Sequence, residues 1–214
     1  MITSFPPLYA ILSADLFPGD PLEWARCLAD SGVQLIQYRD KRASSRERFR
    51  LAATLAALAR AHPFRLVVND RADIAMLTGA GGVHVGQEDL PVEAARRICR
   101  ANCWVGISTH NLEQLRAAAG SSADYVAVGP IFATTSKANP DPAVGLEFIR
   151  QARAHTAKPL VAIGGITSEN AAGVYAAGAD SVAVISDLAR AKDLRARVSA
   201  YLLAAIRAQK LREG

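Results

Sequence analysis

Short apolar runs alternate with longer amphipathic runs along the whole chain. Eight of the short runs are rich in Val, Ile, Leu and Ala, which is typical of strands buried on both faces of a parallel sheet. The predicted strands are Leu8–Leu12, Leu35–Arg39, Leu66–Asn69, Val83–Val85, Trp104–Ser108, Tyr125–Val128, Leu160–Ile163 and Val182–Ile185.

The segments between these runs repeat their apolar residues at the period of an α-helix. The predicted helices are Pro21–Ser31, Ser45–Ala61, Arg71–Leu77, Pro91–Arg100, Leu112–Ala119, Leu146–His155, Ser168–Ala177 and Asp193–Lys210. Two of them begin with clear signals. Asp20, Pro21 and Glu23 supply a cap, a first-turn proline and an acid, and Ser44 with Glu47 forms a capping box.

Strict alternation of strand and helix implies parallel strands joined by right-handed crossovers. Eight such units favour an α/β fold of the closed (β/α)8 TIM-barrel type, and an open doubly wound sheet is the alternative. The 214 residues are few for this barrel, which usually takes about 250. No linker or change of composition divides the chain, so we expect a single domain over residues 1–214.

Composition excludes several classes of protein. Half of the residues are hydrophobic and 21% are charged, which argues against disorder. No apolar run approaches the ~18 residues of a membrane span, and the first residues lack the features of a secretory signal, so a cytoplasmic protein is expected. An odd number of cysteines, three, favours neither a disulfide framework nor a zinc site.

The net charge of +5 suggests anionic partners. The arginines of the chain are spread over many helices without interleaved aromatic residues, which argues against nucleic acid. Phosphorylated small molecules are the expected partners, and the alternative explanation of the charge is a solvated, arginine-rich surface. A homo-oligomer is compatible with these features, which do not decide the oligomeric state.

Polar residues gather at the carboxyl ends of the predicted strands, the edge where barrels of this kind carry their active sites. Along the second strand, Gln37, Arg39 and Lys41 share one face because side chains alternate. On an exposed amphipathic strand such a face would be unremarkable. Inside a barrel it can only line the mouth, where one amide and two cations would bind phosphate oxygens.

Two carboxylates, Asp70 and Asp89, follow the third and fourth strands. Magnesium prefers one or two carboxylates together with water and substrate phosphates, so we expect these two residues to bind Mg²⁺. Structural alternatives exist for each. Asp89 could cap the helix that begins at Pro91, and Asp70 could pair with Arg71 or Arg39.

His84 lies between two valines in the fourth strand and therefore points into the barrel. It could be a hydrogen-bonded core histidine or a substrate contact.

A second anion site is expected across the mouth. Gly164 and Gly165 end the seventh strand, and Ile185 and Ser186 end the eighth, where barrels often hold a phosphate on backbone N–H groups. A loop of hydroxyls and a lysine follows the sixth strand, comprising Thr134, Thr135, Ser136 and Lys137. Two phosphorylated substrates facing each other would fill these two sites.

Six motifs in this order and spacing resemble the thiamine phosphate synthase family. They are Gln37-Tyr38-Arg39-Asp40-Lys41, Val68-Asn69-Asp70-Arg71, His84-Val85-Gly86-Gln87-Glu88-Asp89, Gly106-Ile107-Ser108, Gly129-Pro130-Ile131-Phe132 with Lys137, and Ile163-Gly164-Gly165-Ile166. The resemblance runs from about Leu8 to Ser186. One departure is Ser136, where many members carry threonine, and it preserves the hydroxyl.

The resemblance implies an enzyme of thiamine biosynthesis that joins hydroxymethylpyrimidine diphosphate to thiazole phosphate or its carboxylated form. The products would be thiamine phosphate and diphosphate, plus CO2 from the carboxylated substrate. It also implies a carbocation on the pyrimidine that the thiazole nitrogen captures. Alternatives are a thiazole tautomerase on the same fold and a non-catalytic barrel that binds phosphorylated ligands.

The resemblance further implies a role for each residue of the site. Mg²⁺ would lie on Asp70 and Asp89. The pyrimidine diphosphate would lie on Gln37, Arg39, Lys41, Asn69, Ser108 and Lys137. The thiazole phosphate would lie on Thr134, Thr135, Ser136, Gly165, Ile185 and Ser186.

Overall fold

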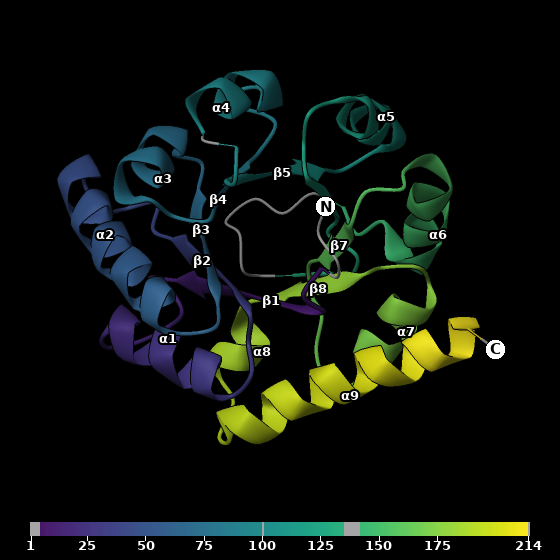
Figure 1. Ribbon diagram of the computed structural model, residues 1–214. Coiled ribbons are helices and arrows are strands. Elements are labelled where there is room, and N and C mark those ends of the chain that lie inside the picture. The colour runs from purple at the N-terminus through teal and green to yellow at the C-terminus, as the bar shows by residue number, and fades with distance from the viewer. Residues whose placement is uncertain (1–4, 100, 135–141, 214) are drawn as a thin grey trace.

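Eight parallel strands form a closed barrel with a ring of helices around it (Figure 1). The computed structural model describes residues 5–99, 101–134 and 142–213. The strands are β1 (Leu8–Ser13), β2 (Leu35–Arg39), β3 (Arg65–Asn69), β4 (Gly82–Val85), β5 (Trp104–Thr109), β6 (Tyr125–Val128), β7 (Leu160–Ile163) and β8 (Ser181–Val184). They pair in sequence order, and β1 closes on β8 with Leu8 opposite Val182. This closure confirms the barrel and excludes the open sheet.

The helices lie on the outside of the barrel, with α1 to α7 between successive strands and α8 and α9 after the last strand. They are α1 (Pro21–Asp30), α2 (Ser45–Ala61), α3 (Ala72–Thr78), α4 (Val92–Ile98), α5 (Leu112–Gly120), α6 (Gly145–His155), α7 (Ala171–Ala176), α8 (Ser186–Ala189) and α9 (Leu194–Glu213). The long α9 packs against α7 and α8 (Figure 1). Among the helices described, none is long and apolar enough to cross a membrane.

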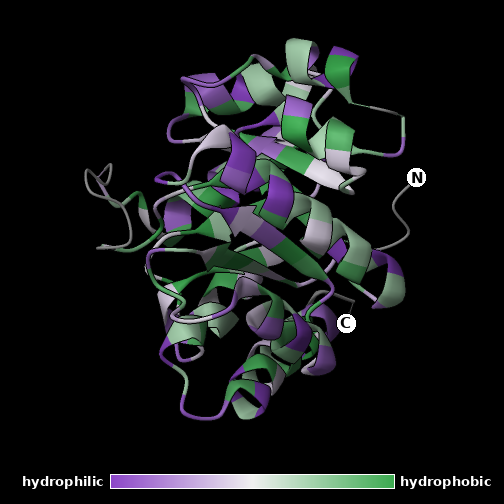
Figure 2. Ribbon diagram, turned by 90° about the vertical axis from the view of Figure 1, so that its left-hand side faces the viewer, coloured by the Kyte–Doolittle hydropathy of each residue, from purple (hydrophilic) through white to green (hydrophobic). Residues whose placement is uncertain are grey.

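The predicted helix starts are confirmed where the sequence carried a cap. The Asp20 side chain accepts a hydrogen bond from the backbone of Leu22 at 2.9 Å. The capping box of Ser44 and Glu47 is present in both directions. Figure 2 shows hydrophobic and hydrophilic residues following one another around the turns of the helices, as the periodic pattern requires.

The buried side chains form two layers. The inner layer fills the barrel and includes Tyr9, Leu35, Val67, Tyr125 and Val161. A larger outer layer lies between the strands and the helices. Residues of one strand alternate between the layers, so polar residues at inward positions necessarily face the barrel axis.

The end of the eighth strand differs from the prediction. Strand β8 stops at Val184, and Ile185 instead precedes the helix α8. This helix has four residues, which is too short for a helical period to show in the sequence. Helix α7 also begins later than predicted, because residues 168–170 form a turn in which Asn170 Oδ1 accepts a hydrogen bond from Thr167 N at 2.9 Å.

Candidate active site

The inward face of β2 carries the predicted polar residues toward the mouth of the barrel. Gln37 is buried, with 2% of its surface exposed, and donates from Nε2 to the Tyr9 hydroxyl at 2.6 Å. Arg39 is half-buried, with Nη1 3.3 Å from Ser13 Oγ. Lys41 lies beyond the strand and is exposed. The three side chains therefore rise in order from the core to the mouth.

A pair of carboxylates lies beside this face. Lys41 Nζ is 3.4 Å from Asp70 Oδ2. Asp70 follows β3, and its backbone N donates to the carbonyl of His84 at 2.7 Å. Burial, and then the neighbouring Asp89 carboxylate, raises the pKa of Asp70, while Lys41 lowers it. The two acids are thus close enough to repel each other when both are charged.

Neither structural alternative for these acids is supported. Asp89 Oδ2 accepts a hydrogen bond from the backbone of Gly86 at 2.7 Å, and the N-terminus of α4 has no side-chain cap. Arg71 pairs with Asp73 and Arg39 contacts Ser13, whereas the ion pair of Asp70 is with Lys41. Asp70 is therefore held at the mouth by Lys41, and Asp89 by the backbone of Gly86, and neither caps a helix nor pairs with a neighbouring arginine.

This donor set suits a hard divalent cation. A cation between Asp70 and Asp89 would relieve their repulsion, and oxygen ligands are what magnesium prefers. Two carboxylates are what a magnesium ion needs from the protein when water and substrate oxygens complete its shell. Among the described residues, no larger group of three or more His, Cys, Asp or Glu side chains is placed to bind a metal.

His84 and Ser108 lie on adjacent strands just below the acids. His84 Nε2 is 2.8 Å from Ser108 Oγ, and His84 Nδ1 is 3.0 Å from the hydroxyl of Tyr125. The Tyr125 hydroxyl is in turn 3.0 Å from that of Tyr9. Both ring nitrogens of His84 are thus hydrogen-bonded inside the barrel, as in the core-histidine interpretation. The two tyrosines were not predicted as part of the site.

Across the mouth, the loops after β6 and β7 are joined. Ile131 N donates to the carbonyl of Ile163 at 2.8 Å, and Phe132 N donates to that of Gly164 at 3.0 Å. Gly165 has a φ of +62°, and a Cβ there would lie 2.5 Å from the Ala133 carbonyl oxygen. At Gly164, a Cβ would lie 2.4 Å from the Cβ of Pro130. Gly164 and Gly165 therefore allow the two loops to pack closely, in addition to any phosphate contact.

The remaining residues of the second anion site lie on this side of the mouth. Ile185 and Ser186 are half-buried at the start of α8. Thr134 is half-buried at the end of the β6 loop. Thr135, Ser136 and Lys137 lie outside the described residues, so their roles remain predictions.

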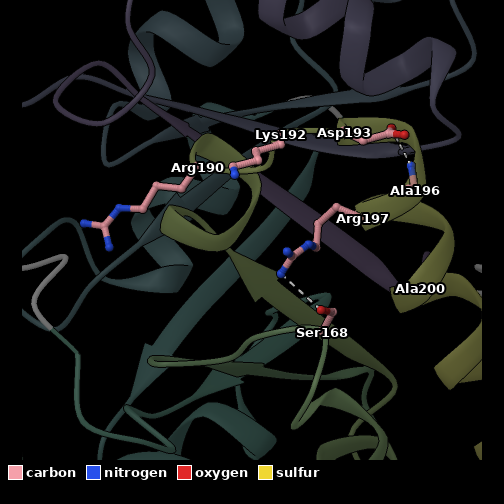
Figure 3. A pocket seen from close by; sticks show the side chains of 7 residues that line it. All are labelled: Ser168, Arg190, Lys192, Asp193, Ala196, Arg197 and Ala200. Atoms are coloured by element: carbon pink, nitrogen blue, oxygen red, sulfur yellow. Dashed lines mark hydrogen bonds between the residues drawn. The ribbon is translucent and has the colours of Figure 1, made fainter.

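A separate groove lies between the turn after β7 and the segment that joins α8 to α9 (Figure 3). Its lining comprises Ser168, Arg190, Lys192, Asp193, Ala196, Arg197 and Ala200. Arg197 contacts Asp187 at 2.6 Å and Ser168 Oγ at 3.1 Å, while Arg190 points away from them (Figure 3). None of the predicted site residues lines this groove.

Comparison with known proteins matches the sequence to the family described as thiamine monophosphate synthase over residues 8–188. The thiamine-phosphate synthase of Koribacter versatilis is 51% identical over 92% of this chain and 94% of that protein. The enzyme of the same name from Shouchella clausii is 40% identical over 92% of this chain and 95% of its own length.

The chain belongs to this family. A solved structure of thiamine phosphate pyrophosphorylase from Pyrococcus furiosus has a TM-score of 0.84 at 33% identity, with 94% of this chain and 96% of that chain covered. Members of the thiamine monophosphate synthase family are enzymes that act on phosphorylated small molecules, and they generally use Mg²⁺. The carboxylate pair and the cationic face of β2 are in keeping with both properties.

Proposed function

We propose that the protein is a thiamine-phosphate synthase of thiamine biosynthesis. It joins hydroxymethylpyrimidine diphosphate to thiazole phosphate or its carboxylated form. The bond from the pyrimidine methylene carbon to diphosphate breaks, and a bond from that carbon to the thiazole nitrogen forms. Diphosphate leaves, together with CO2 when the thiazole is carboxylated. The observation that carries the proposal is the carboxylate pair beside the cationic β2 face, at one mouth of a barrel from this family.

The first half of the site binds the pyrimidine diphosphate. Arg39 and Lys41 contact the diphosphate oxygens, and a guanidinium can hold two of them at once. Gln37, Asn69 and Ser108 line the adjoining wall, and Lys137 adds a cation. Mg²⁺, when bound by Asp70 and Asp89, supplies positive charge to the leaving diphosphate. The protein thus contributes position and charge rather than a nucleophile.

The second half of the site binds the thiazole phosphate. The first N–H groups of a helix have no intrahelical acceptor, so the backbone of Ser186 is available to an anion. Gly165, Ile185 and the hydroxyls of Thr134, Thr135 and Ser136 complete this half. The two substrates then face each other across the barrel axis.

The test measures diphosphate release from the two purified substrates in the presence of Mg²⁺. Release that requires both substrates supports the synthase. A protein that isomerises the carboxylated thiazole but releases no diphosphate would instead be a tautomerase, and one that only binds the substrates would be a non-catalytic barrel.

A charge-preserving variant tests the first half of the site. Arg39→Lys keeps the positive charge but cannot hold two phosphate oxygens at once as a guanidinium does. We expect kcat/KM to fall tenfold or more, since a charged hydrogen bond contributes about 1.5–3 kcal/mol. Arg42→Lys is the matched control, because the Arg42 side chain is 77% exposed and its guanidinium pairs with Asp15. Wild-type turnover by Arg39→Lys would show that charge alone suffices there.

A further inference from the structure

A chain of hydrogen bonds crosses the buried interior of the barrel from β2 to β5. It runs from Gln37 Nε2 to the Tyr9 hydroxyl (2.6 Å), to the Tyr125 hydroxyl (3.0 Å), to His84 Nδ1 (3.0 Å), and from His84 Nε2 to Ser108 Oγ (2.8 Å). Both tyrosines are at most 1% exposed. Buried polar groups must find their partners inside the protein, so the direction of each bond can be worked out.

The direction follows from the Tyr9 end. The Gln37 amide N–H is a donor, so the Tyr9 oxygen accepts there. Within the described ranges, the only other polar group bonded to the Tyr9 hydroxyl is the Tyr125 hydroxyl. Tyr9 must therefore donate its hydrogen to the Tyr125 oxygen. The hydrogen of Tyr125 is then left for His84 Nδ1.

This arrangement selects one form of the histidine. Because Nδ1 of His84 accepts from Tyr125, a neutral ring carries its hydrogen on Nε2 and donates it to Ser108 Oγ. The Ser108 oxygen is thereby occupied as an acceptor, and its own hydrogen is free to be donated to another group. Ser108 is half-buried near the carboxyl end of β5, so that hydrogen can be directed toward the mouth.

The surroundings hold the two phenols in place and keep them protonated. A Cβ on Gly106 would lie 2.0 Å from the Tyr125 ring, so this glycine makes the space that the ring fills. The ring of His84 stacks on that of Tyr125 with centroids 5.5 Å apart. Burial raises the pKa of both Tyr9 and Tyr125 far above that of an ordinary phenol, so each remains a hydrogen-bond donor at any working pH.

We propose that Tyr9 and Tyr125 are positioning residues that fix His84 in its Nε2–H form and so make Ser108 a hydrogen-bond donor to the pyrimidine diphosphate. The second half of this statement rests on the proposed function, which assigns Ser108 to that substrate. The first half concerns the histidine alone. Neither tyrosine is a catalytic residue, since each acts only through His84.

The first experiment reads the histidine directly and needs no substrate. In the wild-type protein labelled with ¹⁵N-histidine, the His84 signals, assigned by their loss in His84→Gln, should show a protonated Nε2 and an unprotonated Nδ1 at neutral pH. A protonated Nδ1 in the wild type would overturn the proposal. Tyr125→Phe, and more weakly Tyr9→Phe, should shift the signals toward a mixture of the two neutral forms, and unchanged signals in both variants would contradict it.

The second experiment is a double-mutant cycle on kcat/KM. If Tyr125 acts through Ser108, Tyr125→Phe should cost roughly tenfold alone but less than twofold in a Ser108→Ala background, because the donor that it orients is already gone. Tyr175→Phe is the matched control, since its buried hydroxyl donates to Pro7 outside the barrel interior at 2.8 Å. It should leave kcat/KM unchanged.

The outcomes separate the two halves of the proposal. Additive losses in the cycle would overturn the action of Tyr125 through Ser108. Wild-type kinetics of Ser108→Ala would overturn the assignment of Ser108 to the substrate, and with it the second half of the proposal. The ¹⁵N result on His84 would still stand.

Discussion

At the scale of single residues, Asp70 combines three features that each oppose folding. Among the described residues, it is the only one other than glycine with a positive φ, at 63°. This conformation costs of order 1 kcal/mol or more. Its carboxylate is partly buried, and it lies beside a second carboxylate. Such unfavourable features concentrate at functional sites, where a ligand compensates for them. Asp70 is therefore best explained by the cation that it would share with Asp89.

Replacement of Asp70 should show that its charged side chain destabilises the protein when no cation is bound. A carboxyl group whose pKa is raised on folding binds protons more tightly in the native state than in the unfolded state. The native state therefore loses stability as the pH rises from the usual pKa of an aspartate, about 4, through the raised value, because the group becomes charged. In Mg²⁺-free buffer at pH 7, Asp70→Asn should therefore have a higher Tm than wild type, and the gain should shrink toward pH 4. Asparagine tolerates the positive φ, so no new strain is added. In the same variant, diphosphate release should require more Mg²⁺.

A neighbouring acid provides the control for this measurement. Hydrogen bonds from Arg71 lower the pKa of Asp73, so its charge stabilises the native state and that benefit is lost as the pH falls through the lowered value. Asp73→Asn should therefore lower the Tm at pH 7 and leave the Mg²⁺ requirement unchanged. An unchanged or lower Tm for Asp70→Asn would argue against a repelling pair of acids.

At the scale of elements, the two loops after β6 and β7 act as one unit because their backbones are hydrogen-bonded to each other. Their contact depends on Gly164 and Gly165, both of which have positive φ values. At Gly164 a Cβ would lie 2.4 Å from that of Pro130. The loop that carries Thr134 is thus positioned by the loop that carries Gly165, and both belong to the proposed thiazole phosphate half of the site.

Gly165→Ala should therefore damage both stability and the second substrate's binding. The added methyl meets backbone atoms at a positive φ, so a loss of about 1–3 kcal/mol is expected in urea unfolding, with a raised KM for thiazole phosphate. Gly173→Ala is the matched control. Gly173 lies within α7, where the nearest atom to a new Cβ is 3.6 Å away, so the variant should be as stable as wild type or up to ~1 kcal/mol more stable. An unchanged KM in Gly165→Ala would remove this loop from the thiazole half.

The sequence predicted the elements that extend over several residues and missed those that depend on closure of the barrel. Alternating runs located all eight strands, and the period-two pattern placed Gln37 and Arg39 on the inward face. The helix α8 was too short to show a period. Tyr9 and Tyr125 were missed because each resembles an ordinary core aromatic within an apolar run. Only the closed barrel brings β1 and β6 together across the axis, with the tyrosine hydroxyls 3.0 Å apart.

At the scale of the whole molecule, the two ends of the barrel have different tasks. The proposed chemistry lies at the carboxyl ends of the strands, whereas the opposite end is closed by aromatic packing. Phe5 stacks on Trp104 with centroids 5.3 Å apart, and the guanidinium of Arg65 lies 3.9 Å from the centre of the Trp104 ring. Arg65 also donates to the carbonyls of Gly81 and Asn102, which ties β3 to the chain around β4 and β5. In barrels of this type, residues at this end serve stability.

Trp104→Leu should therefore separate stability from catalysis. Leucine keeps an apolar side chain but loses the ring stacking and the cation–π contact, which together contribute about 1–3 kcal/mol. Urea unfolding followed by circular dichroism should show a loss of that size, while kcat and both KM values stay at wild-type levels well below the unfolding midpoint. Arg39→Lys should show the opposite result, with wild-type unfolding and impaired turnover. If Trp104→Leu instead raised either KM, the two ends of the barrel would be coupled, because the inner layer from Phe5 through Tyr125 would be transmitting the change to His84 and Ser108.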